Sequence, residues 1–118
     1  MKLYFEYEFP NWNDYINLER RNLYAANKQK QREKEYVKLA TIGKKYIGKY
    51  PIEIIINPHF KDHRQDLDNT RIKGLLDGLV NAGVIKNDNL TCIQKITYES
   101  IFDNRKGIEV EIKELWRK

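Results

Sequence analysis

The stretch from residue 66 to residue 88 constrains this chain more than any other, because it places three aspartates around one short apolar segment. Asp66 and Asp68 stand one residue apart, and Asp88 follows at the far end of the segment. Carboxylates this close in sequence repel one another, and they persist most easily when a cation lies among them. Hard oxygen ligands favour Mg²⁺, Mn²⁺ or Ca²⁺. The pattern therefore predicts a divalent metal site.

The segment between these aspartates is predicted to be an amphipathic helix. Apolar residues recur at helical spacing over residues 72–80, and Gly83 suits the position just past a helix end. Lys73 and Asp77 are an i,i+4 pair on the polar side. A second interpretation stays open, in which the first two aspartates are turn and cap residues and Lys73–Asp77 is a surface pair.

Positive charge is concentrated in one part of the chain, whose net charge is +5. Residues 11–50 hold ten Lys or Arg and four Asp or Glu, so the rest of the chain sums to −1. A basic segment beside an acidic site is expected of an enzyme that binds and cuts a phosphate backbone, although a basic run is often only a solvated helix face. Residues 27–35 are polar all round, so we expect none of them to be buried. The candidates for DNA contact are Arg20, Arg21, Lys28, Lys30, Arg32, Lys34, Arg64 and Arg71.

Aromatic residues accompany the first of these arginines. Tyr15 and Tyr24 could contact a DNA backbone or an unstacked base, since aromatic rings suit stacking. A place in the core is an equal alternative for both.

The remaining pattern predicts an α/β fold with a mixed β-sheet and helices packed against it, in a single domain over residues 1–118. Helical patterns begin near residue 13 and recur over 36–48, with a break expected near the polar tract or a projection beyond the body. The β-branched run 51–57 predicts a central strand covered on both faces and ended by Asn57-Pro58. The other predicted strands are 2–9, 90–101 and 108–115, the last two paired as a hairpin.

Composition excludes several classes of protein. The chain has no apolar run long enough for a membrane helix, and its alternating N-terminus does not predict a signal peptide. A single cysteine, Cys92, excludes an internal disulfide and suits a reducing cytoplasm. A zinc site is not expected, because only one Cys and two His are available. The two histidines, His59 and His63, could serve the predicted divalent metal site as ligand or base, although loop histidines more often do neither.

The stretch from residue 66 resembles the signature of the RusA family of phage-type Holliday junction resolvases. That pattern runs D-x-D-N, a lysine, L-D-x-L, A-G and a final aspartate. The matching residues here are Asp66, Asp68, Asn69, Lys73, Leu76-Asp77-Gly78-Leu79, Ala82-Gly83 and Asp88. Three residues, Thr70-Arg71-Ile72, separate the asparagine from the lysine, where the family usually has two.

The resemblance implies a RusA-like fold and a homodimeric endodeoxyribonuclease that resolves four-way DNA junctions. It implies that Asp66, Asp68 and Asp88 bind Mg²⁺, with Mn²⁺ as a substitute, and that Lys73 is needed for cleavage. Arg71 could take part of the role of Lys73, because the extra residue lies at the start of the helix. A phage or prophage origin would place the protein in a bacterial host cytoplasm.

Two other functions stay open from the sequence. The first is a non-catalytic module of the same fold that binds branched DNA. The second is a small basic protein that binds RNA or a protein partner and uses its aspartates structurally.

Overall fold

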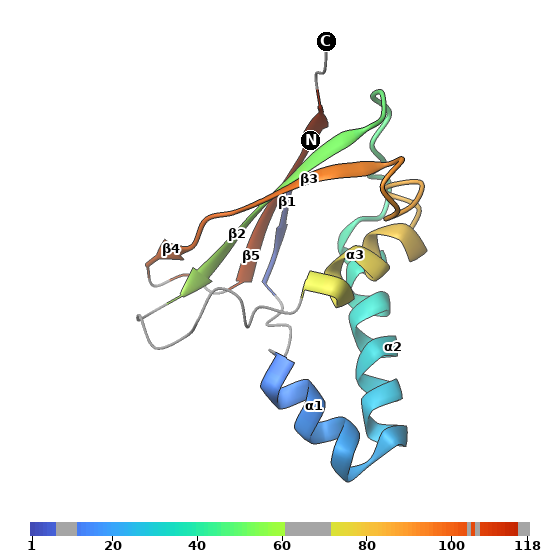
Figure 1. Ribbon diagram of the computed structural model, residues 1–118, viewed down its shortest axis with the longest axis vertical. Coiled ribbons are helices and arrows are strands. Elements are labelled where there is room, and N and C mark those ends of the chain that lie inside the picture. Colours follow the sequence, from blue (N-terminus) through green and yellow to red (C-terminus); the bar gives the residue numbers. More distant parts are fainter. Residues whose placement is uncertain (7–11, 61–71, 104, 106, 116–118) are drawn as a thin grey trace.

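A computed structural model describes residues 1–6, 12–60, 72–103, 105 and 107–115 of the chain. Within these residues, helices pack against a mixed β-sheet, which confirms the predicted α/β class (Figure 1). The elements in chain order are β1 (Lys2–Phe5), α1 (Trp12–Arg21), α2 (Leu23–Ala40), β2 (Ile52–Phe60), α3 (Ile72–Asn81), β3 (Ile93–Tyr98), β4 (Ile101–Phe102) and β5 (Gly107–Glu114).

The sheet has the strand order β1-β5-β2-β3, and β4 lies beside the end of β2. β2 runs antiparallel to β5 and parallel to β3 and β4, and β1 runs antiparallel to β5. The strand directions are therefore mixed, as predicted. The predicted hairpin between residues 90–101 and 108–115 is wrong, because β2 lies between β3 and β5 and pairs with both.

β2 is the central strand that its β-branched residues predict, but it does not end at Asn57-Pro58. The Ile56 carbonyl accepts a hydrogen bond from the Glu99 N–H at 3.1 Å, so the backbone groups of Ile56 face the β3 side. Backbone groups two residues apart point the same way, so Pro58 also faces that side. Its register position falls in the gap between the end of β3 and the start of β4. The missing N–H of proline therefore removes no ladder hydrogen bond.

The core lies between one face of the sheet and the helices α2 and α3. Side chains alternate along each strand, and the helix-facing set is apolar. Its buried members include Leu3, Phe5, Ile52, Ile54, Ile56, Val110 and Ile112, which cluster with Val37, Leu75 and Leu79 from the helices. The opposite face of β2 carries Glu53 and His59, both buried. The prediction was a strand covered on both faces, and on this face the long side chains of Lys95 and Lys113 lie beside Glu53.

α1 and α2 form a helical hairpin that projects away from the sheet (Figure 1). The expected break falls at Asn22, between the two helices, and the polar tract 27–35 lies inside α2. Within that tract Glu33 is only 1% exposed and Gln29 is also buried, so the expectation that nothing there is buried is wrong. Both lie on the helix face that points inward.

The second helical segment is also shorter than predicted. α2 ends at Ala40, and the hydroxyl of Thr41 donates to the Val37 carbonyl at 2.7 Å. That bond and the backbone bond from the Thr41 N–H to the same carbonyl close the last turn. Residues 41–51 then form a loop, so the predicted helix over 36–48 is wrong in its second half.

Candidate functional site

Helix α3 carries Lys73 in its first turn. Leu75, Leu76 and Leu79 are buried in the core, which leaves Lys73 exposed on the outer side of the helix. Its Nζ atom lies 3.8 Å from Oδ1 of Asp77, which confirms the predicted i,i+4 pair. Pairs of this kind on a helix surface contribute only about 0.3–0.5 kcal/mol. Lys73 can therefore exchange Asp77 for a phosphate oxygen at little cost.

The far end of α3 is closed by the glycine that the sequence predicts. Gly83 has φ of +77°, a conformation that other residues adopt only with strain. Its N–H donates to the Val80 carbonyl, and the Val84 N–H donates to the Leu79 carbonyl, both at 3.0 Å. These two bonds form a Schellman motif. Because Val84 is fully buried, the loop that carries Asp88 starts from a fixed point.

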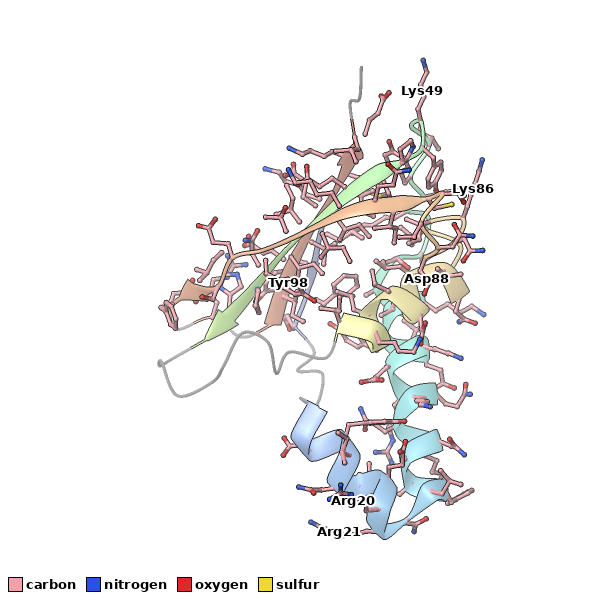
Figure 2. All side chains as sticks on the ribbon, viewed as in Figure 1. Arg20, Arg21, Lys49, Lys86, Asp88 and Tyr98 are labelled. Atoms are coloured by element: carbon pink, nitrogen blue, oxygen red, sulfur yellow. The ribbon has the colours of Figure 1, made fainter. Side chains whose placement is uncertain are left out.

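Asp88 lies in that loop, outside the core and exposed (Figure 2). Its N–H donates to Oδ1 of Asn87 at 2.8 Å. Nearby, the Thr91 hydroxyl donates to Oδ1 of Asn89 at 2.6 Å. The loop therefore orders its backbone through its own amide side chains, and the Asp88 carboxylate is accessible from solvent.

The loop 41–51 supports the Asp88 loop from the other side, a contact that the sequence reasoning missed. The Tyr46 N–H donates to the Val84 carbonyl at 2.9 Å, and the Lys86 N–H donates to the Tyr50 hydroxyl at 3.0 Å. The Lys86 Nζ atom also lies 5.1 Å from the centre of the Tyr50 ring. The sequence does place two tyrosines, Tyr46 and Tyr50, among the lysines of residues 44–50. The contact was not predicted from them because residues 36–48 were predicted to be a helix.

This contact creates a basic surface beside the Asp88 loop, which we call the loop surface. Its members are exposed lysines from two separate parts of the chain, Lys44, Lys45, Lys49 and Lys86. Figure 2 shows Lys49 and Lys86 pointing outward near the same edge of the molecule. None of the four was predicted to contact DNA.

Several predicted site residues lie outside the described part of the chain. They are His63, Arg64, Asp66, Asp68, Asn69 and Arg71. Among the residues that the structure does describe, no three His, Cys, Asp or Glu side chains gather closely enough to hold a metal. Two of the three predicted ligands fall in the segment 61–71, so the metal site stays a prediction. Lys73 and Asp88 are described: Lys73 lies in the first turn of α3, and Asp88 lies in the loop that follows the helix.

The predicted phosphate contacts of the hairpin are at its surface. Arg20 and Arg21 lie in the last turn of α1, at the end of the hairpin farthest from the sheet (Figure 2). Lys28, Lys30 and Arg32 are exposed on α2, whereas Lys34 is half-buried.

The structure separates the two tyrosines whose roles the sequence left open. Tyr15 is 5% exposed and is therefore a core residue of the hairpin. Tyr24 is 68% exposed and is a surface residue. Lysine ammonium groups lie over both rings, with Lys30 at 5.7 Å from the Tyr15 centroid and Lys28 at 5.2 Å from the Tyr24 centroid.

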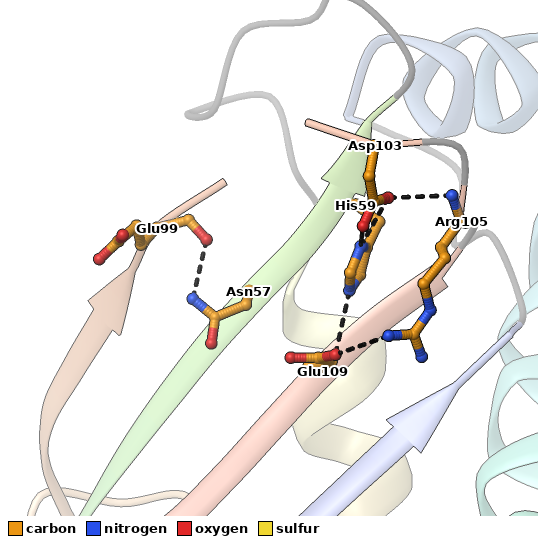
Figure 3. A network of polar contacts seen from close by, with 6 residues as sticks. All are labelled: Asn57, His59, Glu99, Asp103, Arg105 and Glu109. Atoms are coloured by element: carbon orange, nitrogen blue, oxygen red, sulfur yellow. Dashed lines mark hydrogen bonds and ion pairs between the residues drawn. The ribbon is translucent and has the colours of Figure 1, made fainter. Parts of the chain in front are cut away.

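His59 lies within a polar cluster on the sheet face away from the helices (Figure 3). Its Nδ1 atom is 3.0 Å from Oδ1 of Asp103, its Nε2 atom is 3.3 Å from Oε1 of Glu109, and its side chain is 2% exposed. The hydrogen bond from His59 holds the pKa of Asp103 below its usual range. Arg105 completes the cluster, 3.3 Å from Glu109 and stacked at 4.5 Å over the Tyr4 ring. These contacts tie β2 to β5, so His59 is engaged structurally.

Glu53 is another buried carboxylate with a structural role. It accepts a hydrogen bond from the Thr97 hydroxyl at 2.7 Å, and the ammonium groups of Lys95 and Lys113 lie 3.5 and 3.7 Å from its oxygens. The Thr97 hydrogen bond, helped by the two lysines, lowers the pKa of Glu53. Its charge is therefore matched within the sheet, in contrast to the exposed Asp88.

An α/β protein that combines exposed basic surfaces with an accessible aspartate beside one of them has the features of a DNA-processing enzyme. The family described as endodeoxyribonuclease RusA matches the chain over residues 4–113. The chain therefore belongs to the RusA endodeoxyribonuclease family, and this membership implies Holliday junction resolvase activity on branched DNA. No curated protein sequence matches the chain. Among the described residues, no helix is both long and apolar enough to cross a membrane.

Proposed function

We propose that this protein is a divalent-metal-dependent resolvase that cuts a four-way DNA junction by paired phosphodiester hydrolysis. The family match over residues 4–113 carries the proposal, because it spans the whole D-x-D-N, lysine and aspartate motif. The proposed cofactor is Mg²⁺, with Mn²⁺ as a substitute, held by Asp66, Asp68 and Asp88. Three carboxylates are a suitable donor set, since Mg²⁺ prefers hard oxygen ligands and usually keeps several waters. The exposure of Asp88 is compatible with this role.

A divalent ion at such a site lowers the pKa of a bound water and offsets charge on the phosphate. The protein's own contribution comes from Lys73 and from the support of the Asp88 loop. Lys73 would place its ammonium beside the charge that develops on the phosphate. Asp77 holds that ammonium at the helix surface until the substrate replaces it. If the extra residue before Lys73 redirects its side chain, Arg71 would share this role.

Binding of the DNA backbone would use the exposed cations of the hairpin, together with Arg64. Contacts of this kind neutralise phosphates and release counterions, so they favour DNA without reading its sequence. The protein would act as a homodimer. A four-way junction has two-fold symmetry, so two related active sites could make the paired cuts.

Cleavage of a synthetic four-way junction tests this proposal, with a linear duplex of matching sequence as the substrate control. Reactions in Mg²⁺, Mn²⁺, Ca²⁺ and EDTA would compare the wild type with Asp68→Asn, Lys73→Ala and, as a carboxylate control at an exposed position outside the motif, Glu99→Gln. We expect symmetric nicks that need Mg²⁺ or Mn²⁺. Asp68→Asn should bind the junction without cutting it, Lys73→Ala should cut about 100-fold more slowly, and Glu99→Gln should behave as wild type.

Other outcomes would redirect the proposal. Junction binding without cleavage in any metal would favour the non-catalytic module, which the extra residue between Asn69 and Lys73 makes the second candidate. Equal binding of junction and duplex without cleavage would favour the third function, a small basic protein that binds RNA or a protein. Undiminished cleavage by Lys73→Ala would move its role to Arg71.

A further inference from the structure

The end of the helical hairpin exposes two large side chains that the proposed hydrolysis does not use. Leu23 is 63% exposed and Tyr24 is 68% exposed, and they are consecutive in the first turn of α2. Together with Arg20, Arg21 and Lys28 they form what we call the hairpin tip. An exposed apolar residue is common on its own. An adjacent pair at the end of a projection, away from the core, is a candidate contact surface (Figure 1).

The backbone of the hairpin tip is fixed by the single residue that joins the helices. Asn22 has an extended conformation, with φ of −160° and ψ of 103°, and its Oδ1 accepts the Ala25 N–H at 3.2 Å. Its own N–H donates to the Leu18 carbonyl at 2.9 Å. This N-cap orders the first turn of α2, which carries Tyr24. The tip is therefore organised before any partner binds, which lowers the entropy cost of binding.

Charge indicates which partner the hairpin tip suits. From residue 20 to residue 32 the sequence has five Lys or Arg and no Asp or Glu. Arg20, Arg21 and Lys28 are all exposed. The Lys28 Nζ atom lies 5.2 Å from the centre of the Tyr24 ring, so a cation and an aromatic ring lie side by side at the hairpin tip. An aromatic ring with one cation over it and other exposed cations near it in the sequence matches a nucleobase flanked by phosphates better than it matches an apolar protein surface.

We propose that Tyr24 stacks on an unstacked base at the branch point of the junction. Arg20, Arg21 and Lys28 contact the phosphates beside that base. This inference rests on the proposed function, since it takes branched DNA as the ligand. In a continuous duplex every base is stacked between neighbours, so the ring gains its contact only where strands exchange. The hairpin tip would thus contribute to the preference for junctions over duplex.

Fluorescence of 2-aminopurine placed at the branch point tests the stacking contact. The full chain would be titrated in Ca²⁺ against the labelled junction and a labelled linear duplex, with affinities from anisotropy and cleavage in Mg²⁺ measured in parallel. Variants would be Tyr24→Ala, Tyr24→Phe and Leu39→Ala. Leu39 lies on the same helix near its other end and is 70% exposed, so it is a matched control for an exposed apolar side chain.

We expect the wild type to change the fluorescence of the junction and not of the duplex. Tyr24→Ala should lose that change and bind the junction about tenfold more weakly, with duplex binding unaltered. Tyr24→Phe should retain both properties because it keeps the ring. Leu39→Ala should match the wild type. Circular dichroism of each variant verifies that the fold is intact.

Four results would overturn the inference. If Tyr24→Ala keeps the wild-type signal and affinity while the wild type cuts junctions, the stacking contact fails and the proposed function stands. If Tyr24→Phe does not restore the signal, the ring is not the interacting group. If Tyr24→Ala leaves the fluorescence unaltered but dissociates a dimer in sedimentation, the hairpin tip binds a second copy of the chain. If the wild type neither cuts nor prefers the junction, the proposed function itself fails.

Discussion

Individual carboxylates in this protein differ mainly in what surrounds them. Glu53 is buried and bound to a hydroxyl and two ammonium groups. Asp103 and Glu109 bind the two sides of His59. Asp88 is exposed on a loop held by other residues. Sequence spacing cannot distinguish these roles, because the partners of Glu53 and Asp103 come from distant parts of the chain.

The lowered pKa of Glu53 makes stability depend on pH in a defined direction. A carboxyl whose pKa is lower in the folded protein stabilises the fold above its unfolded pKa, near 4.5, and loses that contribution as pH falls through the folded value. Glu53→Gln should therefore be less stable than the wild type at neutral pH, and the difference should shrink as the pH falls below 4.5. Urea unfolding over this range measures it, with Glu99→Gln as the exposed control. Curves that stay parallel down to acid pH would contradict the assignment.

The cluster around His59 gives a second prediction at the residue scale. His59→Phe keeps a ring of similar size but removes both ring nitrogens, so Asp103 loses its hydrogen bond with Nδ1 and Glu109 loses its 3.3 Å contact with Nε2. We expect thermal unfolding at neutral pH to shift down by much more than for Arg105→Gln, since the Arg105–Glu109 pair is exposed and such pairs contribute at most about 1 kcal/mol. Equal shifts for the two variants would show that His59 acts only by filling space.

At the scale of whole elements, the packing of α2 against α3 depends on a glycine inside a helix. A Cβ atom on Gly78 would lie 2.7 Å from Cγ2 of Val37, closer than side chains approach one another. Glycine disfavours a helix interior by about 1 kcal/mol relative to alanine. The close approach of the helices accounts for its presence, because only a residue without a side chain fits there.

Gly78→Ala should therefore destabilise the protein by about 1–3 kcal/mol, against its gain in helix propensity. In a Val37→Ala background the same change should cost much less, because the methyl groups that it meets are gone. Chemical denaturation of the two single variants and the double variant gives the coupling energy. Additive effects would mean that α2 and α3 are not in contact at this point.

The features that depend only on residues close together in the sequence, such as those of α3, were predicted correctly. The apolar spacing of α3, its Gly83 cap and the Lys73–Asp77 pair are all confirmed. The hairpin between the last strands was wrong because β2 inserts between them, and pairing at that range depends on the whole sheet. The end of α2 and the loop 41–51 were missed for a related reason. Tyr46 and Tyr50 are ordered by hydrogen bonds with Val84 and Lys86, which lie 38 and 36 residues farther along the chain.

The molecule as a whole presents two basic surfaces, one predicted from sequence and one found in the structure. Arg20 and Arg21 mark the end of the hairpin, whereas Lys49 and Lys86 lie toward the opposite end of a molecule that is 46 Å long (Figure 2). Asp88 lies between them in that view. A substrate that reached Asp88 could contact either surface. The contribution of each surface to DNA affinity therefore has to be measured on the whole protein.

Charge-neutralising variants of equal size separate the two surfaces. The hairpin variant would combine Lys28→Gln, Lys30→Gln and Arg32→Gln, and the loop variant Lys44→Gln, Lys45→Gln and Lys49→Gln. Each phosphate contact contributes about 0.9 to the slope of log affinity against log salt, so losing three contacts lowers the slope by up to about 2.7. We expect the hairpin variant to approach this value and the loop variant to change the slope by less than half as much. Junction affinity measured at several salt concentrations gives both slopes. A larger change in slope for the loop variant than for the hairpin variant would mean that the loop surface beside Asp88 makes most of the phosphate contacts. The projecting hairpin would then be secondary in DNA binding.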